Sequence, residues 1–140
     1  MAKQIFINLP VKDLTKTIEF FTKLGFKFNP QFTDENATCM IIGENIFAML
    51  LVEKFFKSFI SKEIADAKKT TEVLLGLHFG SRKEVDEVLN KAIKAGGIES
   101  KEAQEHGWMY SRSFEDINGH IWEMFYMNMD KMPQEMKEKK

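Results

Sequence analysis

The sequence has little of several things, and each shortage excludes a class of protein. A single cysteine, Cys39, excludes an intramolecular disulfide and so a disulfide-stabilised scaffold. No apolar run reaches the length of a membrane span, and no charged-then-apolar leader opens the chain. The net charge of −1 supplies no field to attract nucleic acid or an anionic membrane. We therefore expect a cytoplasmic protein with no nucleic-acid or membrane partner.

What the sequence does contain is typical of a folded globular chain. Hydrophobic residues make up 44% of its 140 residues and charged residues 29%, which is ordinary for a single domain with a substantial core. We expect one domain over residues 1–140. Its parts are a first module at about 3–60, linker helices at about 53–72, a second module at about 73–128 and a C-terminal tail at 129–140.

The first half of the chain predicts the order β-α-β-β-β. Residues 3–9 alternate as a strand, with Ile5, Ile7 and Leu9 on one face and Phe6 and Asn8 on the other. A helix then begins after the N-cap Asp13 and ends at Gly25. Extended runs at residues 27–32, 37–42 and 46–52 follow, separated by turn residues. Cys39 lies in the second of these runs, which favours a buried, inert thiol.

The second half predicts the same order. A strand at 73–80 is followed by the Ser81/Glu84 capping box, a helix that ends at Gly96 and Gly97, and further strands. Each module thus has one helix, which covers one sheet face and leaves the other free. We predict an α+β fold in which two βαβββ modules form a curved mixed sheet with a cleft on its concave face.

The last two strands are predicted as a hairpin over residues 108–126, with Asn118-Gly119 in the turn. A two-residue turn pairs even positions of the first strand with odd positions of the second, which places Arg112 on the same face as Glu123 and Phe125. Two interpretations remain open. The two charges form a cross-strand ion pair that fixes the register, or they serve a ligand in the cleft.

Side chains alternate between the two faces of a strand, so we expect Phe6 and Asn8 of the first strand to line the cleft together with the hairpin. Clefts lined by aromatic side chains with a few polar groups are the usual sites for small molecules. Trp122 is expected in the core and Trp108 at the mouth of the hairpin. The predicted ligand-binding residues are Phe6, Asn8, Trp108, Tyr110, Arg112 and Phe125.

The order of elements and the stretch Asp116-Ile117-Asn118-Gly119-His120-Ile121-Trp122-Glu123, together with Val11-Lys12-Asp13-Leu14, resemble the vicinal oxygen chelate superfamily. That superfamily includes lactoylglutathione lyases (glyoxalases), bleomycin-resistance proteins, fosfomycin-modifying enzymes and extradiol dioxygenases. Residues 29–36 and 106–110 are most similar to its small bacterial lactoylglutathione-lyase-like group. The resemblance spans roughly residues 3–128 and implies a small-molecule ligand and a homodimer.

In metal-using members of that superfamily, the last metal ligand is a glutamate that Glu123 matches. The metal-ligand position in the first strand is occupied by Phe6, which cannot bind a metal. The corresponding metal-ligand position in the second module falls between Leu74 and Leu77. His78 would act as a ligand only if the register slipped by one residue, and such a slip reverses the face on which a side chain lies. A divalent ion needs at least three donors, so Glu123 and His78 are the metal candidates and a bound metal is not favoured.

Several functions fit these patterns. The resemblance implies a glyoxalase/bleomycin-resistance-like protein with a small-molecule cleft, a degenerate metal site and an unknown reaction. One alternative is an active metal-dependent lyase, isomerase or dioxygenase, and another is a metal-free protein that sequesters an antibiotic or metabolite. A metal-free enzyme would use Glu123 as base with Tyr110 or Arg112 as electrophilic support. The phenylalanine-rich segment 53–64 fits core, interface or lid.

Overall fold

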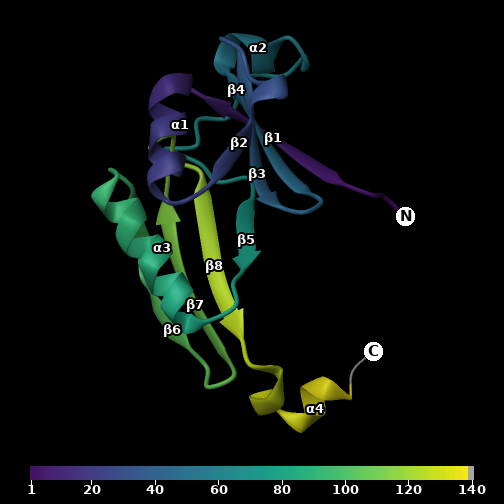
Figure 1. Cartoon of the computed structure of the whole chain (residues 1–140), viewed down its shortest axis with the longest axis vertical. Helices are drawn as coiled ribbons and strands as arrows, with labels where there is room; N and C mark the ends of the chain where they lie inside the picture. The colour runs from purple at the N-terminus through teal and green to yellow at the C-terminus, as the bar shows by residue number, and fades with distance from the viewer. Residues whose placement is uncertain (139–140) are drawn as a thin grey trace. The chain divides into compact units, whose positions relative to one another are not determined.

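Residues 1–138 are described by a computed structural model, and they fold as two units whose boundary lies between Thr70 and Thr71 (Figure 1). The first unit contains β1 (Ile5–Val11), α1 (Leu14–Lys23), β2 (Lys27–Asn29), β3 (Ala37–Gly43) and β4 (Ile46–Val52). The second contains β5 (Leu74–His78), α3 (Arg82–Lys94), β6 (Ile98–Glu105), β7 (Met109–Glu115) and β8 (Ile121–Met127). The predicted α+β fold with two βαβββ modules is confirmed.

Each unit has its own four-stranded mixed sheet with the same topology. The strand order is β1-β4-β3-β2 in the first unit and β5-β8-β7-β6 in the second. In both sheets the first and last strands of the module lie side by side in parallel, and the other neighbours are antiparallel. The cleft expected from this repeat stays a prediction.

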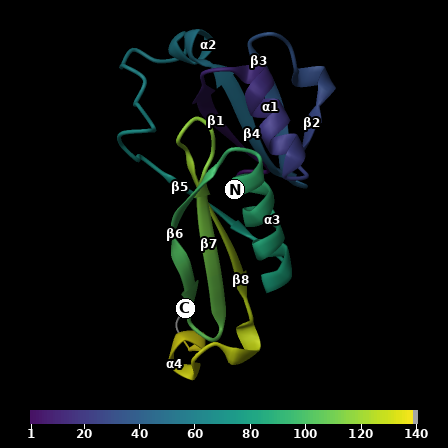
Figure 2. The same ribbon diagram turned by 90° about the vertical axis from the view of Figure 1, so that its left-hand side faces the viewer.

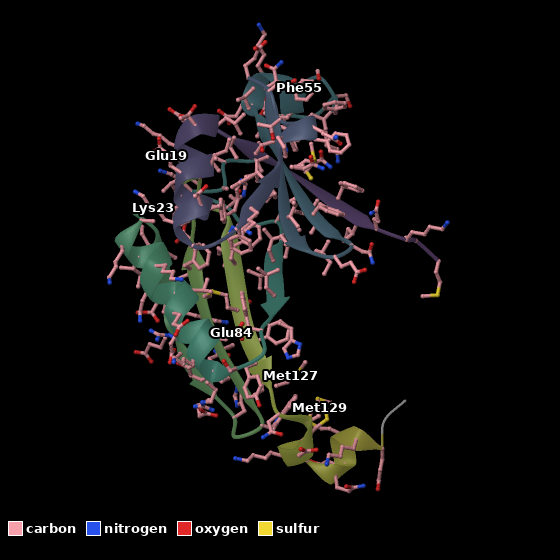
Figure 3. All side chains as sticks on the ribbon, viewed as in Figure 1. Glu19, Lys23, Phe55, Glu84, Met127 and Met129 are labelled. Atoms are coloured by element: carbon pink, nitrogen blue, oxygen red, sulfur yellow. The ribbon has the colours of Figure 1, made fainter. Side chains whose placement is uncertain are left out.

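The first unit packs α1 on one face of its sheet. The helix begins where the Asp13 carboxylate accepts a hydrogen bond from the Lys16 amide (3.0 Å), and it ends before Gly25, whose φ is +102°. Phe20 and Phe21 of α1 are buried, whereas Glu19 and Lys23 lie on the exposed side of the helix (Figure 3). Cys39 of β3 is also buried, as predicted, and burial raises the pKa of its thiol.

The second unit repeats this arrangement with α3, which lies against the sheet in both views (Figures 1 and 2). The Ser81 hydroxyl accepts a hydrogen bond from the Glu84 amide (3.1 Å), so the predicted cap is present. Val85, Leu89 and Ala92 of α3 are buried. They are on the same side of the sheet as buried Trp122 and Met124, which confirms that Trp122 is a core residue.

The segment between the units has less helix than the sequence predicts. Only α2 (Glu53–Lys57) forms in residues 53–72. No side chain caps the start of α2, and the Ser58 hydroxyl donates to the Phe55 carbonyl (2.6 Å) where it ends. Phe55 packs edge-to-face on Phe59, which remains 69% exposed.

The C-terminal tail is short and follows β8. It contains the 3₁₀ turn η2 (Met129–Lys131) and α4 (Gln134–Lys137), while Lys139 and Lys140 of the predicted tail lie outside the described residues. No helix in residues 1–138 is long and apolar enough to cross a membrane.

The β7–β8 turn differs from the prediction in one decisive way. Its loop has three residues, Ile117, Asn118 and Gly119, rather than two. The Asp116 amide donates to the His120 carbonyl (2.9 Å), the Gly119 amide donates to the Asp116 carbonyl (3.0 Å), and Gly119 has a φ of +95°. This is the usual form of a three-residue hairpin loop, and it shifts the pairing of the two strands by one residue.

The Asp116 carboxylate holds this turn together. It is 5% exposed and accepts hydrogen bonds from the amides of Asn118 (2.8 Å) and His120 (3.1 Å). Its second oxygen accepts from the Trp122 indole (2.9 Å), which links the turn to the core. Burial raises the pKa of Asp116, although the charge of His120 and these hydrogen bonds oppose the rise.

We expect Asp116→Ala to lower the free energy of unfolding by roughly 2–4 kcal/mol, because several buried donors lose their acceptor. Urea denaturation measures the loss. Asp66→Ala is the matched control, since the Asp66 carboxylate accepts one amide hydrogen bond, from Lys68, in an exposed turn (3.1 Å). Equal losses in the two variants would contradict this role for Asp116.

Candidate functional site

The sheet of the first unit has a face opposite α1 that carries a pair of aromatic side chains, one exposed and one half-buried. Phe6 and Asn8 of β1 lie on this face beside their β4 partners Phe47 and Met49. The Phe6 and Phe47 rings stack with centroids 4.8 Å apart, and Phe6 is 47% exposed. Nearby, the Asn8 amide donates to the Phe6 carbonyl (3.2 Å). Phe6 and Asn8 thus share a face, but their role in binding stays a prediction.

The face opposite α3 in the second unit carries His78, Glu123 and Phe125. Gly76 pairs with Glu123 and His78 pairs with Phe125, so all four residues lie on one face without any slip in register. His78 therefore lies on the same face as Glu123 in the observed register, and its match to a metal-ligand position of the superfamily stays a prediction. The His78 and Phe125 rings stack with centroids 5.4 Å apart.

Sequence reasoning missed Lys101, the charged partner of Glu123. The Lys101 ammonium lies 3.5 Å from a Glu123 carboxylate oxygen. Lys101 pairs with Ser113, and Ser113 pairs with Glu123, so β6, β7 and β8 bring the three residues together on one face. Residue alternation along β6 gives no signal of this, because the strand contains a register shift between Glu99 and Lys101.

Arg112 and Tyr110 lie on the other face, toward α3. Arg112 pairs with Met124, and Tyr110 pairs with Tyr126, whereas Glu123 pairs with Ser113. The predicted shared face of Arg112 and Glu123 is therefore wrong, because the three-residue loop changes the pairing. The predicted ion pair is replaced by pairs of Glu123 with Lys101 and of Arg112 with Asp86 and Glu99, and a catalytic role for Tyr110 or Arg112 stays a prediction.

Arg112 instead joins α3 to the sheet. One guanidinium nitrogen lies 3.1 Å from an Asp86 carboxylate oxygen and the other lies 3.0 Å from a Glu99 oxygen. The Tyr110 hydroxyl donates to the same Asp86 oxygen (2.6 Å). Arg82 lies over the Tyr110 ring, 4.3 Å from its centroid, and pairs with Glu105. These contacts tie α3 to β6 and β7 and give the cluster a structural role.

The same contacts shift three pKa values. Burial alone would raise the pKa of Asp86, but hydrogen bonds from Tyr110 and Arg112 and the charges of Arg112 and Arg82 lower it overall. Burial and the hydrogen bond to Asp86 raise the pKa of Tyr110. Burial works to lower the pKa of Arg112, but its bonds to Glu99 and Asp86 raise it overall.

Trp108 lies directly before β7 and is half-buried. Its carbonyl accepts a hydrogen bond from the Asn128 amide (2.6 Å), which closes the open end of the β7–β8 hairpin. This contact fixes the backbone at Trp108. A contact between its indole and a ligand stays a prediction.

The donors on these two faces do not form the set that a divalent ion requires. On the face opposite α3, His78 and Glu123 supply two donors, one imidazole stacked on Phe125 and one carboxylate beside an ammonium. On the face opposite α1, the β1 and β4 positions are Phe6, Asn8, Pro10, Phe47, Met49 and Leu51. Within either unit of the described chain, no three His, Cys, Asp or Glu side chains group as metal ligands.

Known proteins are similar to this chain in sequence and in fold. Residues 3–43 match the family model described as bleomycin resistance protein-like N-terminal. The hypothetical protein SA1046 from S. aureus is 30% identical, with 90% of this chain and 95% of that chain covered and a TM-score of 0.76.

The same fold is found in proteins of lower identity. A glyoxalase/bleomycin resistance protein/dioxygenase family enzyme from Burkholderia phytofirmans PsJN is 14% identical, covering 90% of this chain and 99% of that chain at a TM-score of 0.74. The chain belongs to the vicinal oxygen chelate superfamily. A glyoxalase-related enzyme from Fulvimarina pelagi has the superfamily fold at 17% identity, with 89% of this chain and 88% of that chain covered and a TM-score of 0.74. No curated protein matches the sequence.

The lowered pKa of Asp86 gives a prediction about pH. Its carboxylate stabilises the fold at pH values above the ordinary pKa of 3.8, and that stability is lost as the pH falls through the lowered pKa. We expect Asp86→Asn to cost about 0.5–1 kcal/mol at pH 7, because the ion pair is partly exposed, and much less in strong acid. Denaturant unfolding at both pH values measures this.

The adjacent acid on α3 provides the control. Glu87 pairs with Lys83 at 4.0 Å on the helix surface, so Glu87→Gln removes a carboxylate next to Asp86 without touching the Arg112 cluster. A loss from Asp86→Asn that is the same at both pH values would contradict the role of the charged carboxylate.

Proposed function

We propose that this member of the superfamily binds small, flat molecules without a catalytic metal, and that the sheet face opposite α1 in the first unit and the sheet face opposite α3 in the second each offer a binding surface. The observation that carries the proposal is that each face presents a stacked ring pair beside a few polar groups. Phe6 and Phe47 lie beside Asn8 on one face, while His78 and Phe125 lie beside Glu123 on the other. Flat rings bind flat ligands by stacking, and the polar groups fix their orientation.

The chemistry of the side chains supports a metal-independent role. Phe6 stands where the resemblance places a metal ligand in the first module, and its ring offers a stacking surface in place of a donor atom. In the second module, the ammonium of Lys101 lies beside the one matching carboxylate, Glu123. A cation already bound there lessens the need for a metal ion. We propose that the metal site has degenerated and that the protein holds or sequesters its ligand.

Truncating either ring tests this proposal. We expect Phe6→Ala and Phe125→Ala each to weaken binding of a flat ligand to its own sheet face about three- to tenfold, because an aromatic contact is worth about 0.5–1.5 kcal/mol beyond its buried area. Calorimetric titration with bleomycin and with smaller neutral and charged aromatic compounds identifies a ligand and measures its affinity. No saturable binding across the panel would count against the proposal.

A phenylalanine outside these ring pairs serves as the control. Phe32, in the 3₁₀ turn η1 (Pro30–Phe32), is 58% exposed, so Phe32→Ala removes a similar ring. We expect it to leave the affinity unchanged, and a loss equal to that of Phe6→Ala would point to a general effect on folding.

The second candidate is a metal-dependent lyase or isomerase of the lactoylglutathione-lyase type. The observation in its favour is that His78 and Glu123 share one face, two positions apart along neighbouring strands. Among the described residues of the second unit, no third His, Cys, Asp or Glu joins them as a donor, so we rank this candidate below the binding role.

Metal analysis separates the two candidates. After exposure to nickel, zinc or manganese and gel filtration, we expect less than about 0.1 ion per chain and no isomerisation of the glutathione hemithioacetal. Stoichiometric metal that is lost in Glu123→Gln and in His78→Ala, but kept in His106→Ala, would establish the enzyme instead. His106 is a suitable control because it lies in the loop before β7, away from the two donors.

A further inference from the structure

The face opposite α3 carries a row of four residues that runs across all four strands of the second sheet. Gly76 of β5 pairs with Glu123 of β8, Glu123 with Ser113 of β7, and Ser113 with Lys101 of β6. Two small residues thus accompany one acid and one base. The side chain of Lys101 is 42% exposed and that of Glu123 is 22% exposed, so Lys101 is the more exposed of the two residues.

A bulge in β6 places Lys101 on this face. Glu99 pairs with Phe114 and Lys101 pairs with Ser113, so β6 has one extra residue, Ser100, at this point. Glu99 contacts Arg112 on the α3 side, and strict alternation would send Lys101 to that side as well. The bulge turns Lys101 to the opposite face. The Ser100 and Ser113 hydroxyls, 2.5 Å apart, are hydrogen-bonded beside it.

A flat surface lies in the next row along the strands. His78 stacks on Phe125, which is two residues beyond Glu123 and therefore about 7 Å away along β8. Gly76 has no side chain, and a Cβ there would lie 3.4 Å from the edge of the Phe125 ring. Residue 76 therefore lies next to the Phe125 ring and adds no side chain of its own to this face.

We propose that this row binds the carboxylate of a flat aromatic acid, with Lys101 as the group that recognises the negative charge. This rests on the proposed function and names its ligand class. The ligand ring stacks on the His78–Phe125 pair, and its carboxylate reaches Lys101 one row away. An ammonium has three donors, so Lys101 binds the ligand while it keeps Glu123 as a partner.

The weakness of the Lys101–Glu123 ion pair allows the ammonium to be shared with a ligand. A partly exposed ion pair such as Lys101–Glu123 is worth no more than about 1 kcal/mol, so sharing the ammonium with a ligand costs little. Glu123 then acts as a positioning residue that holds the ammonium over the face. The same carboxylate repels an anion that approaches it directly, so specificity for the acid requires the charge of Lys101.

The test uses three probes with the same ring and chain length: 3-phenylpropionate, 3-phenylpropan-1-ol and 3-phenylpropylamine. Titration calorimetry or ligand-observed NMR measures their affinities for the full chain. We expect the acid to bind about tenfold more tightly than the alcohol, as a charge-assisted hydrogen bond predicts, and the amine to bind no better than the alcohol. Lys101→Met should abolish this preference and Lys101→Arg should retain it.

Lys83→Met is the matched control, because Lys83 is an exposed lysine of α3 that pairs with Glu87. It should leave the preference for the acid intact. Equal binding of the three probes, a preference for the amine, or a preference that survives Lys101→Met would overturn the role of Lys101 while leaving small-molecule binding in place. The absence of binding by all three would overturn the ligand class, and the wider panel with Phe6→Ala then decides the proposed function separately.

Discussion

The hydrogen bonding of one buried carboxylate determines which side chains share a face in the second unit. Asp116 accepts from the amides of Asn118 and His120 and from the Trp122 indole, which stabilises a three-residue loop between β7 and β8. The length of that loop sets the register, and the register sends Arg112 toward α3 and Glu123 away from it. A loop shorter by one residue would exchange the two faces of one strand relative to the other.

The two faces of the second sheet consequently carry different kinds of side-chain contact. The face toward α3 contains the Asp86, Tyr110 and Arg112 contacts, which fasten a helix to strands distant in sequence. The opposite face carries Lys101, Glu123 and the His78–Phe125 stack, whose polar and aromatic groups suit a ligand. The charges on the face toward α3 stabilise the unit, and our proposal assigns recognition to the opposite face.

Local signals in the sequence predicted much of the fold. Asp13 and Ser81 cap their helices as expected, and the parity of Phe6 and Asn8 along β1 holds because it depends only on alternation within one strand. The site was harder to predict. The Arg112–Asp86 contact joins residues 26 positions apart, and Lys101 reaches Glu123 through a bulge, so neither has a signature in the neighbouring residues. Asn118-Gly119 favoured a two-residue turn, and the acceptor capacity of Asp116 decided otherwise.

The division of the chain at Thr70 has a consequence for spectroscopy. The lone thiol, Cys39, is buried in the first unit, whereas both tryptophans, Trp108 and Trp122, belong to the second. Each half of the duplicated fold therefore carries its own natural reporter. Thiol labelling follows the opening of one half, indole emission follows the other, and any lag between the two signals reveals whether the halves melt as one cooperative body or in sequence.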